Sequence, residues 1–166
     1  MGCEDNLAAN RQTRMLADLE LVNCYNKSAM DQGKRDTIML NSAKANLERM
    51  AYFGMTEEQQ ISQYLFEETF NLEFKISFQQ YNSSDTHSGA SKDKLDEHMI
   101  EKIRAINHLD NELYKFAHQL LKNRFENMKV TDDSFQAHMQ RLGKEKYEFS
   151  WDDIEDENYD TNDTPA

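Results

Sequence analysis

Long apolar runs are absent from this chain. No stretch approaches the ~20 consecutive apolar residues that a membrane-spanning helix needs, and residues 1–10 lack the basic and apolar regions of a signal peptide. Apolar residues make up 38% of the 166 residues, below the ~45–50% typical of globular proteins. The chain is long enough for one domain with a core, but the sequence predicts no membrane anchor within it.

Positive charge is also scarce. The chain has 19 Lys and Arg against 31 Asp and Glu, for a net charge of -12. Residues 151–166 contain seven of the acids and no Lys or Arg, which predicts a solvated, disordered tail. An acidic chain binds polyanions poorly by itself. We therefore expect no nucleic-acid partner, and any basic cleft has to be local.

Metal-binding and nucleophile motifs are missing as well. The sequence contains no HExxH or CxxC pattern, so no metal site is expected. Surface or helix-cap positions are the predicted role of the five histidines: His87, His98, His108, His118 and His138.

What is present is mainly helical periodicity. Apolar residues recur at three- and four-residue steps in five segments, which predicts helices over residues 33–50, 57–70, 94–106, 110–129 and, more weakly, 132–142. Thr56 and Gln59 fit a capping box for the second helix, and Asp110 fits the N-cap of the fourth.

Two segments have the pattern of strands. Residues 51–54 form a short apolar run, and residues 72–78 alternate apolar and polar side chains, as in a half-buried strand. A loop rich in Ser, Asn, Asp and Gly follows at residues 79–93. A strand, a polar loop and a helix in this order often hold a phosphate group, because free backbone N–H groups and a helix N-terminus point the same way.

The two cysteines, Cys3 and Cys24, are compatible with one disulfide or with two free thiols. Three N-x-Ser/Thr sequons begin at Asn26, Asn82 and Asn162, and they favour an oxidising, lumenal compartment. Pro165 directly after the third sequon makes that one a weak acceptor.

Several strings occur in an order that a generic helical domain does not require. They are AYFGMTEEQQISQYLFEETFNLEFKISFQQYN at 51–82, NRQTRMLAD at 10–18, NCYN at 23–26, LDNELY at 109–114 and NRF at 123–125. In this order they resemble the C-terminal portion of the heparan sulfate 6-O-sulfotransferase family over about residues 6–129, apart from a short insertion near residues 84–93. The resemblance implies an α/β parent fold, the P-loop-like fold of sulfotransferases that depend on 3'-phosphoadenosine 5'-phosphosulfate (PAPS). This chain would be predominantly α, with one or two short strands.

The resemblance also implies a domain organisation and a location. Residues 1–130 would be the C-terminal part of a sulfotransferase domain, 131–150 a weak helical extension, and 151–166 the acidic tail. The family consists of Golgi membrane proteins whose catalytic domain is lumenal. A Cys3–Cys24 disulfide and N-glycosylation at Asn26 and Asn82 would follow.

Two groups of residues match family sites. The loop in which the family contacts PAPS corresponds to Gln80, Tyr81, Asn82, Ser83 and Ser84. By sequence alone an ordinary polar loop is the favoured interpretation of this stretch, and the resemblance reverses that preference. Asp85 stands where related enzymes usually carry Arg. The second group lies in a near-identical family string, where Arg11, Gln12 and Arg14 either clamp a sulfate or carboxylate or pair with Asp18 and Glu20.

The activity that the resemblance implies is sulfate transfer from PAPS to the 6-hydroxyl of glucosamine in heparan sulfate, which would be the acceptor partner. The family uses a catalytic His and a KTGGT-type phosphosulfate loop. Neither is recognisable here, so we assign no catalytic residue and expect no turnover without the missing N-terminal half of the domain. The alternative is a non-catalytic helical interaction module of the same ancestry.

Overall fold

The computed structural model describes residues 8–24, 26–74, 77–78 and 96–142, and these residues form helices and loops without any strand. Two short 3-10 helices and six α-helices follow one another along the described chain. Their bounds are α1 (Arg11–Leu16), η1 (Leu19–Val22), η2 (Lys27–Ala29), α2 (Gln32–Arg49), α3 (Gln59–Phe70), α5 (Glu97–Ile106), α6 (His108–Thr131) and α7 (Phe135–Leu142). None of these helices is long and apolar enough to cross a bilayer.

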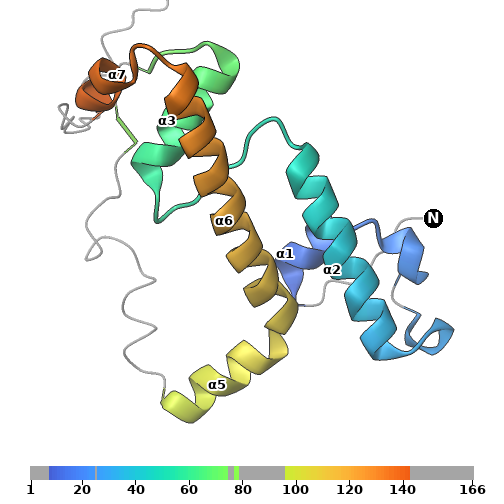
Figure 1. Cartoon of the computed structure of the whole chain (residues 1–166). Coiled ribbons are helices and arrows are strands. Elements are labelled where there is room, and N and C mark those ends of the chain that lie inside the picture. Colours follow the sequence, from blue (N-terminus) through green and yellow to red (C-terminus); the bar gives the residue numbers. More distant parts are fainter. Residues whose placement is uncertain (1–7, 25, 75–76, 79–95, 143–166) are drawn as a thin grey trace, which may run out of the picture.

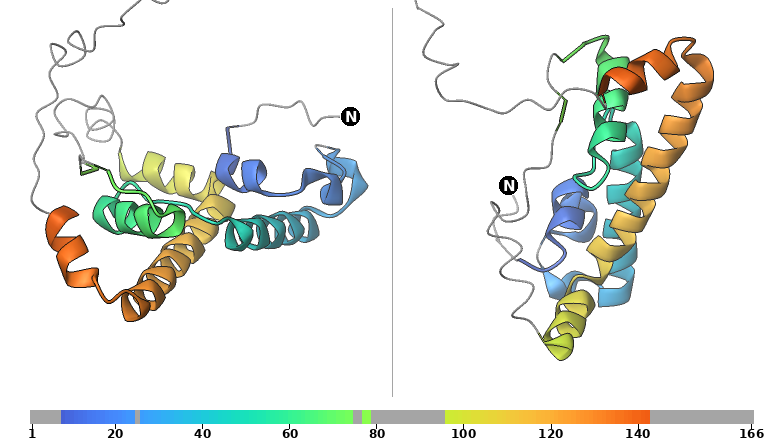
Figure 2. Two further views of the ribbon diagram at one scale, coloured as in Figure 1. Left: turned by 90° about the horizontal axis from the view of Figure 1, so that it is seen from above. Right: turned by 90° about the vertical axis from the view of Figure 1, so that its left-hand side faces the viewer.

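Helix α6 is the central helix of the described chain (Figure 1). Helices α1, α2, α3 and α5 all contact it, while α7 packs on α3. Figure 2 shows α2 beside one half of α6 and α3 beside the other half. Helix α6 is 24 residues long, so one half of it can contact α2 while the other half contacts α3.

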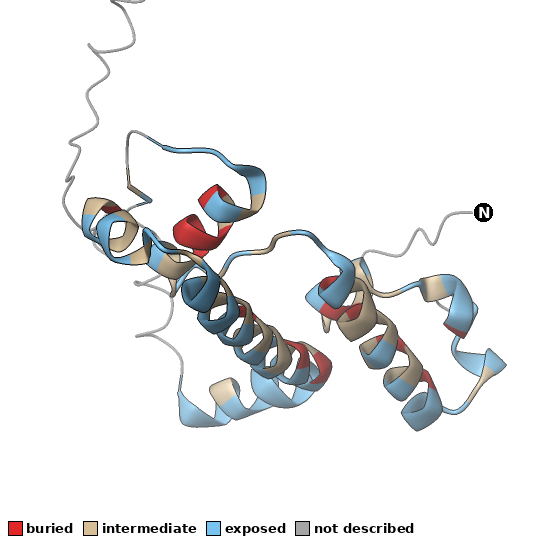
Figure 3. Cartoon of the chain, turned by 45° about the horizontal axis from the view of Figure 1, so that its top comes forward, coloured by how far each residue is buried: buried red, intermediate tan, exposed pale blue. Residues whose placement is uncertain are grey.

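Each half of α6 has its own apolar core. Leu109 and Leu113 of the N-terminal half pack with Val22 and with Met39, Ala43 and Leu47 of α2. In the C-terminal half, Leu121 packs with Tyr64, Leu65 and Leu142. Figure 3 shows buried segments on these helices beside intermediate and exposed ones. Burying one such side chain contributes ~1.5–3 kcal/mol, so the two cores together fix α2 and α3 on α6.

Helices α1 and α6 cap each other at their N-termini. The Asp110 carboxylate accepts hydrogen bonds from the backbone N–H of Gln12 (3.1 Å) and Thr13 (2.7 Å), and from the buried Thr13 hydroxyl (2.7 Å). In return, Asn10 Oδ1 accepts from the N–H of Leu109 (2.9 Å) and Asp110 (3.3 Å). First-turn N–H groups have no partner inside their own helix, so these bonds tie together two segments about a hundred residues apart.

The five predicted helices are confirmed as α2, α3, α5, α6 and α7, but both predicted caps are wrong. Helix α6 begins at His108, and Asp110 caps α1 rather than its own helix. Helix α3 begins only at Gln59 and has no side-chain cap. The Ser62 hydroxyl accepts from Met55 N–H (2.9 Å) and donates to Met55 C=O (3.1 Å). This pair of bonds holds the preceding loop against α3, so no capping box forms.

The predicted strands at residues 51–54 and 72–78 are wrong for the part of the chain that the structure describes, which excludes residues 75 and 76. A strand needs a neighbouring strand to pair its backbone groups, and the described residues supply none. Instead, the N–H groups of Phe74 and Phe78 donate to side chains of α3. The described part of the chain is therefore all-helical, and it shows none of the strands of the predicted α/β parent fold.

The reciprocal caps generate a stability prediction. Asp110→Ala removes the acceptor of three hydrogen bonds and is expected to lower the free energy of unfolding by about 1–2 kcal/mol, measured by urea denaturation. The control is Asp133→Ala, because Asp133 is exposed and its loss is expected to change stability by less than about 0.5 kcal/mol. Equal stability of the two variants would contradict the capping role.

Candidate functional site

The predicted donor loop, Gln80 to Ser84, lies outside the described residues, as does Asp85. The structure does describe the backbone that leads into it. Phe78 N–H donates to Gln63 Oε1 at 2.6 Å, and Phe74 N–H donates to Glu67 Oε1 at 3.1 Å. Gln63 and Glu67 are both buried on α3, one turn apart. Two side chains of one helix thus hold the segment that enters the predicted loop.

The Glu67 carboxylate is the centre of a buried polar network. It accepts hydrogen bonds from Gln63 Nε2 (2.8 Å), Arg141 Nη2 (2.6 Å) and His138 Nε2 (2.6 Å), in addition to Phe74 N–H. Burial by itself raises the pKa of Glu67, but the hydrogen bonds from Gln63, His138, Arg141 and Phe74 outweigh burial and hold the pKa below its ordinary value. An ionised carboxylate therefore joins α3, α7 and residues 72–78.

Arg11, Gln12 and Arg14 lie on the six-residue helix α1, whose buried Thr13 faces α6. Arg14 lines a hollow that also contains Lys27 and Arg35. Gln12 lines a different hollow. The structure therefore places Arg14 apart from Gln12, while Arg11 is exposed one turn before Arg14. Asp18, a predicted ion-pair partner, accepts a hydrogen bond from Glu20 N–H and caps η1.

Arg35 contributes structure rather than a free charge to this hollow. It is buried and donates to the carbonyl oxygens of Val22 (2.8 Å), Asn26 (3.4 Å) and Cys24. These bonds hold the loop between η1 and η2 against α2. Arg14 and Lys27 also line the hollow, together with the carboxylate of Asp36.

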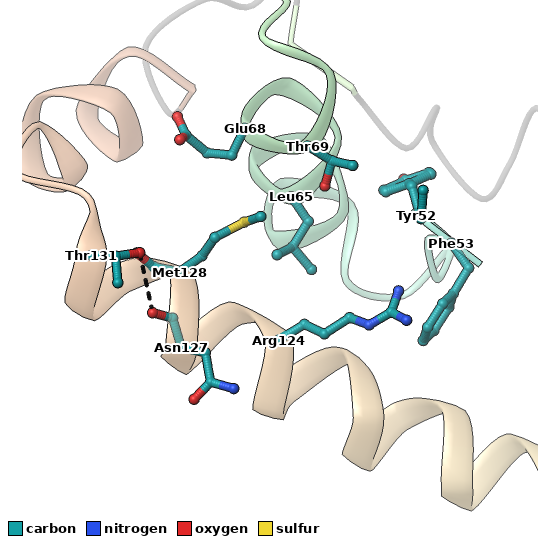
Figure 4. A pocket seen from close by; sticks show the side chains of 10 residues that line it. Tyr52, Phe53, Leu65, Glu68, Thr69, Arg124, Asn127, Met128 and Thr131 are labelled. Atoms are coloured by element: carbon teal, nitrogen blue, oxygen red, sulfur yellow. Dashed lines mark hydrogen bonds between the residues drawn. The ribbon is translucent and has the colours of Figure 1, made fainter. Parts of the chain in front are cut away.

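Another hollow lies between α3 and α6 (Figure 4). Leu65 and Met128 form much of its wall, and its only ionisable side chains with charge are Glu68 and Arg124. Arg124 donates to Glu48 C=O at 2.8 Å and lies over the Phe53 ring, 5.1 Å from the centroid. Among the described residues, no histidine lines this hollow.

Cys24 is disulfide-bonded. Its predicted partner, Cys3, lies outside the described residues, so the pairing stays a prediction. The Asn26 sequon is exposed, and Asn26 Oδ1 accepts from the Ser28 hydroxyl at 2.6 Å. Asn82 and Asn162 lie outside the described residues.

The sequence analysis missed the network around Glu67. It assigned His138 to the surface, yet the His138 side chain is 9% exposed and bonds to two carboxylates. The spacing of His138 and Arg141 on one face of α7 was a possible signal, since residues three apart are neighbours on a helix. Nothing in the sequence indicated that this face meets α3, about seventy residues earlier.

Protonation of Glu67 at acidic pH is the basis of a second prediction. Since the pKa of Glu67 is lowered on folding, its contribution to stability is complete above its ordinary value of 4.5 and is lost as the pH falls through the lowered value. Glu67→Gln is expected to cost about 3–5 kcal/mol at pH 7 and to flatten the decline of stability between neutral and acidic pH, measured by urea denaturation. The exposed Glu101→Gln is the control, and a variant of Glu67 with the wild-type pH profile would contradict this role.

Comparison with known proteins identifies the family. A model described as the sulfotransferase family matches residues 2–117. Heparan-sulfate 6-O-sulfotransferase 2 of Gallus gallus is 50% identical over 129 residues, which are 78% of this chain and 31% of that protein. Heparan-sulfate 6-O-sulfotransferase 1 of Homo sapiens is 52% identical over 126 residues, which are 76% of this chain and 30% of that protein.

A third relative, heparan-sulfate 6-O-sulfotransferase 2 of Homo sapiens, is 44% identical over 147 residues, which are 89% of this chain and 24% of that protein. The chain thus spans less than a third of the length of these curated relatives. It belongs to the sulfotransferase family, and it corresponds to a segment of the heparan-sulfate 6-O-sulfotransferases.

Proposed function

We propose that this chain is the C-terminal portion of a heparan-sulfate 6-O-sulfotransferase. The complete enzyme would transfer the sulfuryl group of PAPS to the 6-hydroxyl of glucosamine residues in heparan sulfate. The observation that carries this proposal is an identity of about one half to three such enzymes over most of this chain. Like those enzymes, the complete protein would act in the Golgi lumen, where the Cys3–Cys24 disulfide and glycans on Asn26 and Asn82 would form.

The contribution of this chain to the donor site would be the loop of Gln80, Tyr81, Asn82, Ser83 and Ser84. Hydroxyl, amide and backbone N–H groups suit the phosphates of PAPS because they donate hydrogen bonds without adding negative charge. The bonds from Phe78 to Gln63 and from Phe74 to Glu67 support this role. They anchor the entrance of the loop to a buried network, and a positioned loop loses less entropy when it binds a ligand.

Arg11 and Arg14 would contact sulfate or carboxylate groups of heparan sulfate. Their spacing puts them on one side of α1, and Lys27 lies in the same hollow as Arg14. Two or three cations suit a polyanion that carries closely spaced charges. Gln12 lies beside another hollow, so we assign it no contact with the same group.

The catalytic base and the KTGGT-type phosphate loop would lie in the part of the relatives that this chain does not match. This chain alone would therefore not catalyse sulfate transfer. A row of partly exposed aromatic rings supports the proposal that further protein structure packs on this chain. The Phe66 ring lies 4.8 Å from the Phe70 ring and 5.4 Å from the Phe74 ring, and the Phe74 ring lies 5.2 Å from the Phe78 ring, measured between centroids. Phe70, Phe74 and Phe78 are 46%, 37% and 40% exposed. The rest of the domain would cover this row, since monomeric proteins rarely expose contiguous apolar surface of this kind.

A non-catalytic interaction module is the alternative function. The exposed row of Phe70, Phe74 and Phe78 would then bind a separate partner. The two functions differ in whether the chain binds the donor nucleotide and whether an N-terminal half restores activity, and the next two predictions test these points.

Donor binding is tested with adenosine 3',5'-bisphosphate, the desulfated donor, in calorimetric titrations of the 166-residue chain. Asp85→Arg replaces a charge that repels phosphate with one that attracts it, and it is expected to tighten binding by about 3–10-fold. Asp133→Arg makes the same charge change at an exposed site and is expected to leave binding unchanged. If neither the wild type nor Asp85→Arg binds the nucleotide, the loop is not a donor site.

Sulfate transfer is tested with a fusion in which the N-terminal part of the chicken relative precedes this chain. The fusion is expected to transfer radiolabelled sulfate from PAPS to heparan sulfate, whereas the chain alone is not. Phe74→Asp in the fusion is expected to reduce transfer at least 10-fold, because a charge would be buried under the added layer. Val130→Asp, at a site that is 83% exposed, is the matched control. An inactive but folded fusion would favour the interaction module.

A further inference from the structure

Three metal-ligating side chains meet where α3, α6 and α7 come together. Glu68 belongs to α3, Asp132 follows the last residue of α6, and His138 belongs to α7. One ligand atom from each lies within 4.8 Å of the other two. Of these atoms, His138 Nδ1 and Glu68 Oε1 are 3.0 Å apart. These residues do not form a ligand-spacing motif, because they come from three separate segments, and the sequence therefore did not predict the cluster.

His138 is oriented for coordination through Nδ1. Its Nε2 lies 2.6 Å from Oε2 of Glu67, whose side chain is fully buried. Its ring also packs on the Tyr64 ring, with the centroids 4.9 Å apart. A carboxylate that accepts the N–H on one side of an imidazole is the usual partner of a metal-bound histidine, because it fixes the ring and the tautomer. With Nε2–H donated to Glu67, Nδ1 faces Glu68 Oε1 at 3.0 Å, where either a proton or a metal ion can lie between the two atoms.

Asp132 is held in place by hydrogen bonds. Its Oδ1 accepts from the Ser134 hydroxyl (2.7 Å) and N–H (2.8 Å), and its Oδ2 accepts from the Tyr64 hydroxyl (2.9 Å). Oδ1 thus uses both of its lone pairs, whereas Oδ2 keeps one, so Asp132 can still bind a cation through Oδ2.

The charge around these residues favours a cation. Three carboxylates, those of Glu67, Glu68 and Asp132, lie together with one guanidinium group, that of Arg141. Arg141 is itself engaged, since its Nη2 lies 2.6 Å from Glu67 and its Nε 3.2 Å from Glu73. A solvent-facing hollow lined by Glu68, His138 and Arg141 leads to the site. The carboxylates at the site therefore outnumber the guanidinium group.

We propose that Glu68, Asp132 and Nδ1 of His138 bind a zinc ion, with Glu67 as the positioning residue for His138. One imidazole nitrogen and two carboxylate oxygens, completed by a water, form a common tetrahedral zinc environment. Zinc bonds of about 2.0–2.2 Å place neighbouring ligand atoms about 3.3 Å apart. The His138–Glu68 pair has to open slightly from its 3.0 Å separation, and ligand atoms that lie up to 4.8 Å apart have to move closer. The bound ion would link α7 and the end of α6 to α3, independently of the donor site.

The test uses the full 166-residue chain with its disulfide oxidised, so that no thiol competes for zinc, after removal of metals with EDTA. Calorimetric titration with zinc chloride is expected to show one site per chain, and thermal melts are expected to rise by about 2–5 °C at saturating zinc. Magnesium chloride is expected to have neither effect, because Mg²⁺ prefers six oxygen ligands. The absence of a one-to-one zinc site would overturn the proposal.

Variants show whether the ion occupies these residues. Glu68→Gln is the main variant, because Glu68 is exposed and the fold does not depend on it; it is expected to weaken zinc binding at least 10-fold. Asp132→Asn is expected to act in the same way. The matched control is His118→Gln, since His118 Nε2 also faces a carboxylate, Glu58, at 3.2 Å but without a third ligand. Zinc affinity that survives Glu68→Gln, or falls as much with His118→Gln, would contradict this site.

Discussion

The buried carboxylate of Glu67 is the contact on which one end of this molecule depends. A charge without solvent is stable only when hydrogen-bond donors surround it, and its donors here come from α3, α7 and residues 72–78. The hydrogen bonds to the Glu67 carboxylate therefore hold α3, α7 and the segment at Phe74 together. The predicted donor loop begins directly after one of these pieces, so the same carboxylate that joins the helices also limits where that loop can start.

The other end of the molecule has a comparable tie in the reciprocal caps between Asn10 and Asp110. Between the two ends, α6 provides continuity, with one apolar core on each half. The aromatic row on α3 and residues 72–78 is left partly exposed. This chain spans less than a third of its relatives' length. Its helices are nevertheless held together by the Glu67 network and the reciprocal caps, and its exposed aromatic row is a surface on which further structure could pack.

Much of the helical framework was predictable, because each long helix carries its own apolar stripe and α2 is capped locally by Asp31. The cap of α1 was not, since its acceptor, Asp110, comes from another helix. Helix α3 has no side-chain cap, and Ser62 instead bonds to Met55 in the preceding loop. The strand predicted at residues 72–78 had the right alternation of side chains. Alternation describes burial of one face, however, and does not supply the second strand that backbone pairing requires.

The sequence by itself determined the family of this chain and its helices, because ordered strings of residues and apolar periodicity are local properties of a polypeptide. Only the tertiary structure decided that Glu67, His138 and Arg141 form one buried network, that Glu68 and Asp132 stand beside it, and that Arg14 and Gln12 line different hollows. These groupings join residues from distant segments, and their chemistry depends on distances and burial that arise only when α3, α6 and α7 pack together.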